Sequence, residues 1–62
     1  MEIEVTQIVR DEGSVVVFQG TSLEDGRVVN FAVDHRCAQA LVDGMCNDEE
    51  VIAFAEPWQV IG

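Results

Sequence analysis

Two runs of β-branched residues, separated by a strong turn signal, most constrain what this chain can fold into. The first run extends from Ser14 to Gln19 and the second from Arg27 to Val33, with Asp25-Gly26 between them. An Asp-Gly pair in this position is typical of a β-hairpin, because both residues tolerate the left-handed backbone that tight hairpin turns require. The sequence therefore predicts an antiparallel pair of strands.

A further strand is predicted before this hairpin. Ile3 and Val5 alternate with polar residues, and a period of two is typical of a strand with one buried face. The alternation changes phase at Ile8 and Val9, which indicates a β-bulge. Residues 11–13 (DEG) form a turn signal, so the first half of the chain is predicted to be a three-stranded antiparallel meander.

The pattern changes from strand to helix at Asp34. An aspartate in this position can cap a helix by accepting hydrogen bonds from the first backbone N–H groups. Residues 35–43 are good or neutral helix formers, and Gly44 is expected to end the helix as a left-handed cap. One apolar stripe is predicted along the helix, formed by Cys37, Leu41 and Met45.

One or two strands are predicted after the helix. Residues 51–55 form an apolar run, Pro57 interrupts it, and residues 58–61 are expected to form a fifth strand or a packed tail. Trp58 is expected to fill the small core, with an anchor at a binding interface as the alternative. The predicted order is β-β-β-α-β(-β), an α+β, mainly β single domain over residues 1–62. A small OB-like barrel and an open sheet with one packed helix both fit this order.

Acidic residues outnumber basic residues so strongly that whole classes of partner are disfavoured. Twelve Asp and Glu residues face three arginines and no lysine, which gives a formal net charge of −9. Binding to nucleic acid or to an anionic membrane requires clustered cations, and Arg10, Arg27 and Arg36 are scattered among acids. The sequence therefore predicts no direct nucleic-acid or membrane binding and favours neutral or cationic partners.

Targeting and membrane signals do not stand out in the sequence. The first residues, MEIE, lack the basic start and apolar middle of a signal peptide, and no apolar run approaches the length of a membrane span. Cys37 and Cys46 are too few for a secreted disulfide scaffold. We expect a cytoplasmic protein.

Residues that could carry chemistry are present, but their spacing does not indicate a catalytic or metal site. His35, Cys37 and Cys46 lack the ligand spacing of a zinc site. A position near a helix N-terminus lowers the pKa of a thiol, but Cys37 also belongs to the apolar stripe and is expected to be buried. His35 is expected at the surface. No enzymatic activity, metal or cofactor is therefore predicted.

The acids suggest one specific hypothesis, which is mimicry of nucleic acid. Alternate residues on a strand lie about 6.6–6.8 Å apart, so Glu2 and Glu4 would present two charges at a spacing comparable to that of neighbouring phosphates. Net charge that only keeps the domain soluble is the competing interpretation. The candidate partner-binding acids are Glu2, Glu4, Glu12, Glu24, Asp25, Asp48, Glu49 and Glu50.

The run near the C-terminus suggests self-association. It is apolar on both faces, and strands buried on both sides have this composition. A single helix covers only one face of a sheet, so pairing with a second copy in a homodimer would bury the other face. A closed barrel with this strand at its centre is the monomeric alternative. The candidate self-association strand is Val51, Ile52, Ala53, Phe54 and Ala55.

Two segments and the use of arginine without lysine carry a weak resemblance. Residues 29–36 (VNFAVDHR) and 56–60 (EPWQV) resemble short uncharacterised acidic proteins of GC-rich actinobacteria and their phages. The resemblance implies a small accessory protein and favours a phage-type inhibitor of host machinery. The sequence thus predicts a small acidic accessory protein that binds a protein partner or itself, with a nucleic-acid mimic as the alternative and an enzyme disfavoured.

Overall fold

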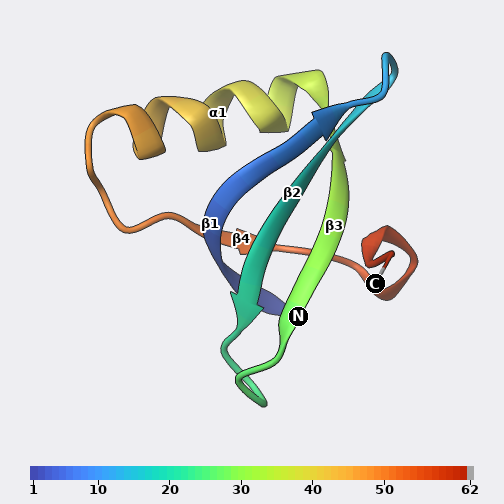
Figure 1. The fold of residues 1–62 in the computed structure, drawn as a ribbon, viewed down its shortest axis with the longest axis vertical. Helices are drawn as coiled ribbons and strands as arrows, with labels where there is room; N and C mark the ends of the chain where they lie inside the picture. The colour runs from blue at the N-terminus through green and yellow to red at the C-terminus, as the bar shows by residue number, and fades with distance from the viewer. Residues whose placement is uncertain (62) are drawn as a thin grey trace.

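A computed structural model describes residues 1–61 of the chain (Figure 1). Its three long strands precede one helix, one short strand and a 3-10 turn. They are β1 (Glu2–Asp11), β2 (Val15–Ser22), β3 (Val28–Asp34), α1 (His35–Cys46), β4 (Ile52–Phe54) and η1 (Pro57–Gln59). The predicted mainly β, α+β fold with the order β-β-β-α-β is confirmed.

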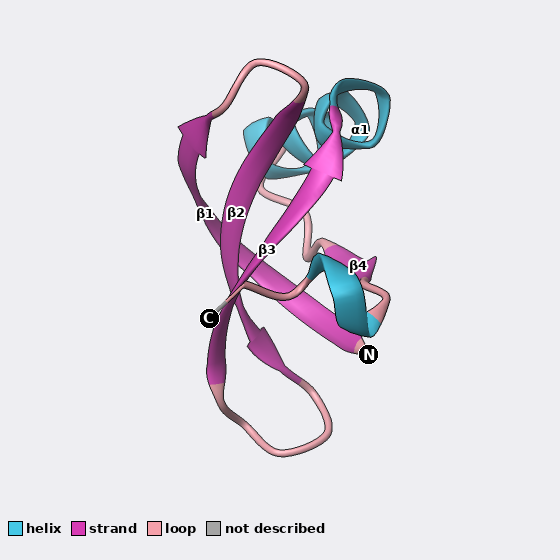
Figure 2. Cartoon of the chain, turned by 90° about the vertical axis from the view of Figure 1, so that its right-hand side faces the viewer, coloured by secondary structure: helices cyan, strands magenta, loops and turns pink. Residues whose placement is uncertain are grey.

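The four strands form one antiparallel sheet in the order β3-β2-β1-β4. The sheet curls into a half-barrel, with α1 lying across one end of it (Figures 1 and 2). This curled but unclosed sheet is therefore intermediate between the predicted OB-like barrel and the predicted open sheet with one packed helix. β4 stands at the edge of the sheet, so the predicted closed barrel with this strand at its centre is wrong.

Irregular pairing in β1 explains part of the curl. The register against β2 shifts between Val5 and Gln7 and again between Ile8 and Arg10, which confirms the bulge predicted from the phase change. Bulges increase the local twist and bend the strand that contains them. Beyond Val5, every residue of β1 is exposed, so the core-facing part of this strand is its first half.

The last described residues cover the outer edge of β3. Val60 forms an isolated bridge with Phe31, and the Ile61 N–H donates to the Asn30 carbonyl over 2.8 Å. The predicted fifth strand or packed tail is therefore a 3-10 turn followed by a single bridge. At the other side of the sheet, no strand among residues 1–61 pairs with the outer edge of β4.

The core lies on the concave face of the sheet and is built around two phenylalanines. Phe18 and Phe31 are fully buried, and their ring centroids are 5.9 Å apart. Trp58 does not fill the core as expected, because its side chain is 78% exposed. Smaller residues complete the buried cluster, namely Ile3, Val5, Val16, Val33, Ala38, Ala53 and Ala55.

Helix α1 begins as predicted but ends later and is turned about its axis. The helix continues past Gly44 and ends at Cys46. Gly44 serves a different purpose, because a Cβ added there would lie 2.7 Å from Val51 Cγ2. The buried residue is Ala38, and Leu41, Val42 and Met45 pack beside the core. Cys37 is exposed, so this member of the predicted stripe is wrong, whereas Leu41 and Met45 pack against the core as predicted. No helix within residues 1–61 is long and apolar enough to cross a membrane.

The predicted cap of α1 is confirmed and makes stability depend on pH. Asp34 Oδ1 accepts a hydrogen bond from the Cys37 N–H over 2.8 Å, and this bond lowers the pKa of the Asp34 carboxyl below its usual 3.8. A lowered folded-state pKa means that the cap stabilises the fold above about pH 4 and loses its effect as the pH falls further.

We therefore expect Asp34→Asn to reduce the loss of stability between pH 5 and pH 3. Asparagine keeps a capping oxygen but does not titrate. Urea midpoints of both proteins across this range measure the effect, and the two curves should converge toward low pH. Parallel curves would show that the cap does not contribute to the acid sensitivity.

Candidate functional site

The predicted acidic residues lie at separate corners of the molecule. Glu12 belongs to the β1–β2 turn, Glu24 and Asp25 to the β2–β3 turn, and residues 48–50 to the loop between α1 and β4. Figure 1 shows these three loops at the upper right, the bottom and the left of the molecule. All of these acids are exposed. The fold therefore does not gather them into one stripe, and this dispersal favours a solubilising role for the loop acids.

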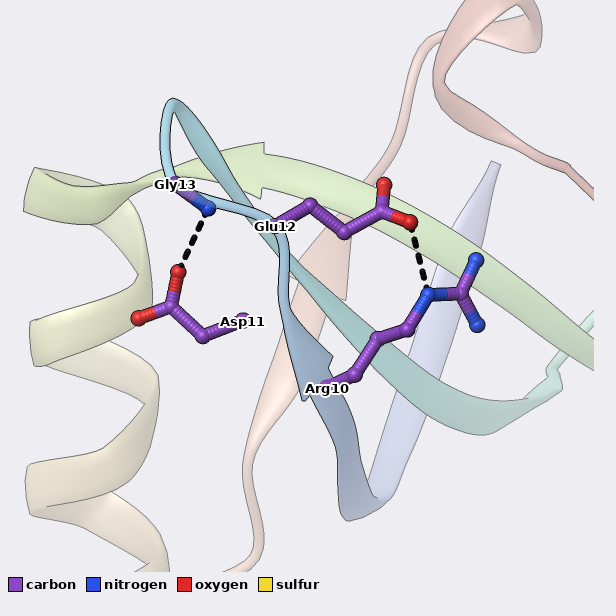
Figure 3. Close-up of polar contacts among 4 residues, drawn as sticks. All are labelled: Arg10, Asp11, Glu12 and Gly13. Atoms are coloured by element: carbon purple, nitrogen blue, oxygen red, sulfur yellow. Dashed lines mark hydrogen bonds and ion pairs between the residues drawn. The ribbon is translucent and has the colours of Figure 1, made fainter.

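Local contacts account for two of these three loops. In the β1–β2 turn, Glu12 Oε2 pairs with Arg10 Nε over 2.7 Å, and Asp11 Oδ1 accepts from the Gly13 N–H over 2.8 Å (Figure 3). In the β2–β3 turn, the Arg27 N–H donates to Asp25 Oδ1 over 3.1 Å. These acids hold turns together, so their positions are explained without a ligand.

Glu2 and Glu4 differ from the loop acids because they stand on a strand beside apolar residues. Glu2 pairs with Phe54, and Glu4 pairs with Ile52, in the ladder between β1 and β4. Residues directly opposite one another share one face of a sheet. The outer face of this strand pair therefore carries two carboxylates and two large apolar side chains together.

The predicted self-association strand is only partly buried. Ala53 and Ala55 belong to the core, whereas the side chains of Ile52 and Phe54 are 42% and 67% exposed. Val51 is half-buried. The two-sided apolar pattern thus reflects one face in the core and one face open to solvent.

Within the described residues, 1–61, the backbone of β4 also presents hydrogen-bonding groups that have no partner. The Val5 N–H bonds to the Val51 carbonyl, and Met1 and Ala55 bond to each other in both directions. In an antiparallel ladder bonded pairs alternate, so the residues between them direct their N–H and C=O groups away from the neighbouring strand. Ile52 and Phe54 therefore offer these groups to the open side of the sheet.

A groove of about 270 Å³ runs beside this edge, between β4 and α1. In Figure 2 the two elements lie at the same side of the half-barrel, with α1 above β4. Seven of the eight lining residues are apolar, and two of these, Val33 and Ala53, belong to the core. Six of the lining residues are Cys37, Ala40, Leu41, Ile52, Phe54 and Gln59.

Sequence reasoning missed the helix side of this groove. Cys37, Ala40 and Leu41 are spaced i, i+3 and i+4, which places them on one face of α1. That apolar face extends beyond the residues that pack against the core, because Cys37 and Ala40 are exposed whereas Leu41 packs beside the core. An apolar stripe that extends beyond the core-facing positions was the signal that could have revealed a second, exposed contact surface.

A second groove, of about 500 Å³, lies between α1 and the far end of β1. It contains Ile8 and Val42 together with a polar pair, in which His35 Nε2 lies 3.4 Å from Asp11 Oδ1. The edge of β1 is unpaired here, but both bulges fall in or next to this segment. Bulges disrupt the regular spacing that an added strand needs, so this edge is a poor template for pairing.

Cys37 and His35 do not form a nucleophile and base pair. His35 lies against Asp11, whereas the Cys37 side chain interacts with Asp34. The Asp34 carboxylate raises the pKa of the Cys37 thiol above its ordinary value, with a smaller contribution from desolvation. The thiolate expected at a helix N-terminus is thus disfavoured by the capping acid, and the expected burial of Cys37 was wrong.

Metal ligands are also dispersed in the described part of the chain. Within residues 1–61, no three His, Cys, Asp or Glu side chains come close enough to hold a metal ion together. His35 and Cys37 lie in the first turn of α1, and Cys46 is its last residue.

Comparison of the chain with protein-family models, with curated proteins and with solved structures found no match.

Proposed function

We propose that this chain is a small cytoplasmic accessory protein that binds another protein through the surface around β4. The observation that carries the proposal is the exposure of three large apolar residues within one short stretch of chain. Ile52, Phe54 and Trp58 are 42%, 67% and 78% exposed, and the first two belong to β4, the strand that borders the groove beside α1. Aromatic residues of this kind are enriched among the anchors of protein interfaces.

The chemistry near the groove supports binding rather than catalysis. Cys37, the candidate nucleophile, has a raised thiol pKa, and its neighbour His35 faces Asp11 across 3.4 Å. A catalytic thiol needs the opposite arrangement, with a lowered pKa and a base within reach. The apolar groove and the exposed Phe54 of β4 fit a contact surface instead.

Phe54→Ser is expected to abolish partner capture while leaving the fold intact. The Phe54 side chain is mostly exposed, so its removal changes stability by no more than about 0.5 kcal/mol. It is also a central aromatic of the proposed interface, where truncation typically weakens binding by about 2 kcal/mol or more, roughly thirtyfold. Capture from an extract of the source cells, followed by identification of the bound protein and calorimetry with that protein, measures the effect.

Val28→Ser is the matched control for this experiment. Val28 is 64% exposed but begins β3, away from the groove residues. It should retain the partner at wild-type affinity. Equal affinity of the Phe54→Ser protein and the wild type would contradict the proposed surface.

A further inference from the structure

We infer that the partner adds an extended, basic segment to the open edge of β4 as a fifth strand of the sheet. This inference rests on the proposed function and specifies how the partner is recognised. It combines two features that lie side by side, the outward backbone groups of Ile52 and Phe54 and the groove between β4 and α1.

The backbone of β4 provides the first half of the recognition. Ile52 and Phe54 each direct one N–H and one C=O group to the open side, as the bonds of Val51 and Ala55 to β1 require. An added strand would satisfy these groups with main-chain hydrogen bonds, which give affinity without depending on the partner's side chains.

The two faces of the added strand would meet different surroundings. Side chains on its inner face would enter the groove, where Leu41 and Cys37 of α1 offer apolar contact. Side chains on its outer face would lie beside Phe54 and Ile52, whose cross-strand neighbours are Glu2 and Glu4. The fold therefore selects a segment with small apolar residues on one face and basic residues on the other.

Charge at the ends of β4 points to a cationic partner. Glu50 and Glu56 flank the strand, and both are exposed. Arg10 and Arg27, by contrast, are paired with Glu12 and Asp25 in distant turns. With a net charge of −9, the chain attracts a basic segment over a long range and accelerates its association.

The same charges disfavour a second copy of this chain as the occupant. Antiparallel pairing of two β4 strands centred on Ala53 would place Glu50 of each copy opposite Glu56 of the other. Like charges directly opposite one another destabilise a strand pair, and both chains carry the net charge of −9. A homodimer through this edge is therefore the weaker alternative, and the experiment below separates the two.

The test uses a capped peptide of alternating valine with lysine or arginine as the probe. Backbone amide hydrogen exchange of the full chain, followed by NMR, reports on strand addition directly. With the probe at ten times its Kd, exchange at Ile52 and Phe54 should slow by roughly tenfold, because only the free fraction exchanges. A control peptide of the same composition with alternating D and L residues keeps the charge but cannot form a regular strand, and it should give no protection.

Two variants separate backbone pairing from side-chain contact. Ile52→Pro removes an outward N–H without touching the bonds of β4 to β1, and proline is tolerated on the open side of edge strands. Ile52→Thr removes apolar area but keeps the N–H. We expect Ile52→Pro to weaken probe binding about tenfold more than Ile52→Thr does, as loss of a main-chain hydrogen bond of about 1.4 kcal/mol implies.

Three outcomes would overturn the inference. Probe binding that shifts the signals of Glu24, Asp25 and Asp48 without protecting Ile52 and Phe54 would show unspecific charge attraction. If the Ile52 amide is protected from exchange without any probe, and this protection rises with protein concentration, a second copy of the chain pairs with the edge of β4. Equal binding by the proline and threonine variants would exclude main-chain pairing. In each case, partner capture that still depends on Phe54 would leave the proposed function standing.

Discussion

Phe18→Ala is expected to leave most of the chain unfolded at 25 °C. Phe18 is fully buried and stacks on Phe31, so it forms half of the aromatic centre of the core. Truncating a buried phenylalanine costs about 3–5 kcal/mol. A core of this size supplies roughly 3–5 kcal/mol in total, so the substitution removes nearly all of the stability.

Urea unfolding followed by circular dichroism measures this loss. Val28→Ala is the matched control, because Val28 is 64% exposed and its truncation should change stability by no more than about 0.5 kcal/mol. A Phe18→Ala protein with the urea midpoint of the control would show that the core is centred elsewhere.

Gly20→Ala is expected to be comparably severe for a different reason. Gly20 lies on β2 opposite Val5, where β1 approaches closely. A Cβ at this position would collide with Ile3 Cγ2 and would lie 2.5 Å from the Glu4 carbonyl oxygen. The carbonyl belongs to the backbone and can move only if β1 separates from β2. We therefore expect the free energy of unfolding to fall by about 3 kcal/mol or more, which is at the upper end of the range for overpacked sites.

Gly13→Asn provides the control for this prediction. Gly13 has φ of +91°, and no atom lies within 4 Å of an added Cβ, so its turn has space for a side chain. Asparagine tolerates a left-handed backbone better than most residues. The free energy of unfolding should therefore fall by less than about 1 kcal/mol. A Gly20→Ala protein as stable as the Gly13→Asn protein would show that β1 and β2 are less closely packed than the structure indicates.

The strands and the start of the helix could be predicted because local residue chemistry determines them. β-Branched runs indicated β2 and β3, the phase change at Ile8 and Val9 indicated a bulge in β1, and Asp34 indicated the cap of α1. Each of these features depends on neighbours in the sequence. The strand order β3-β2-β1-β4 follows from contacts between β1 and β4, which are distant in sequence.

The errors arose where tertiary contacts decide between two local possibilities. Gly44 resembles a helix cap in the sequence, but it serves the close approach of Val51. Trp58 was expected in the core because of its size, yet Phe18 and Phe31 already fill the centre. Cys37 lies one position away from the buried Ala38, and periodicity alone does not fix a helix's rotation to within one residue.

The candidate site was predicted in part. The apolar run at residues 51–55 predicted the strand β4, but the sequence could not show that its outer face and edge stay open. The helix residues Ala40 and Leu41 join the groove only because α1 packs across that end of the half-barrel. The loop acids, prominent in the sequence, are dispersed by the fold.

Photo-crosslinking from position 54 in living cells tests the central claim most directly. A photoreactive phenylalanine analogue in place of Phe54 should crosslink to one protein, through a peptide that contains basic residues in an extended segment. The same analogue at position 28, which is equally exposed on β3, should give no such product. Crosslinks of equal yield and identity from both positions, or crosslinks from position 54 only to a second copy of the chain, would contradict the account.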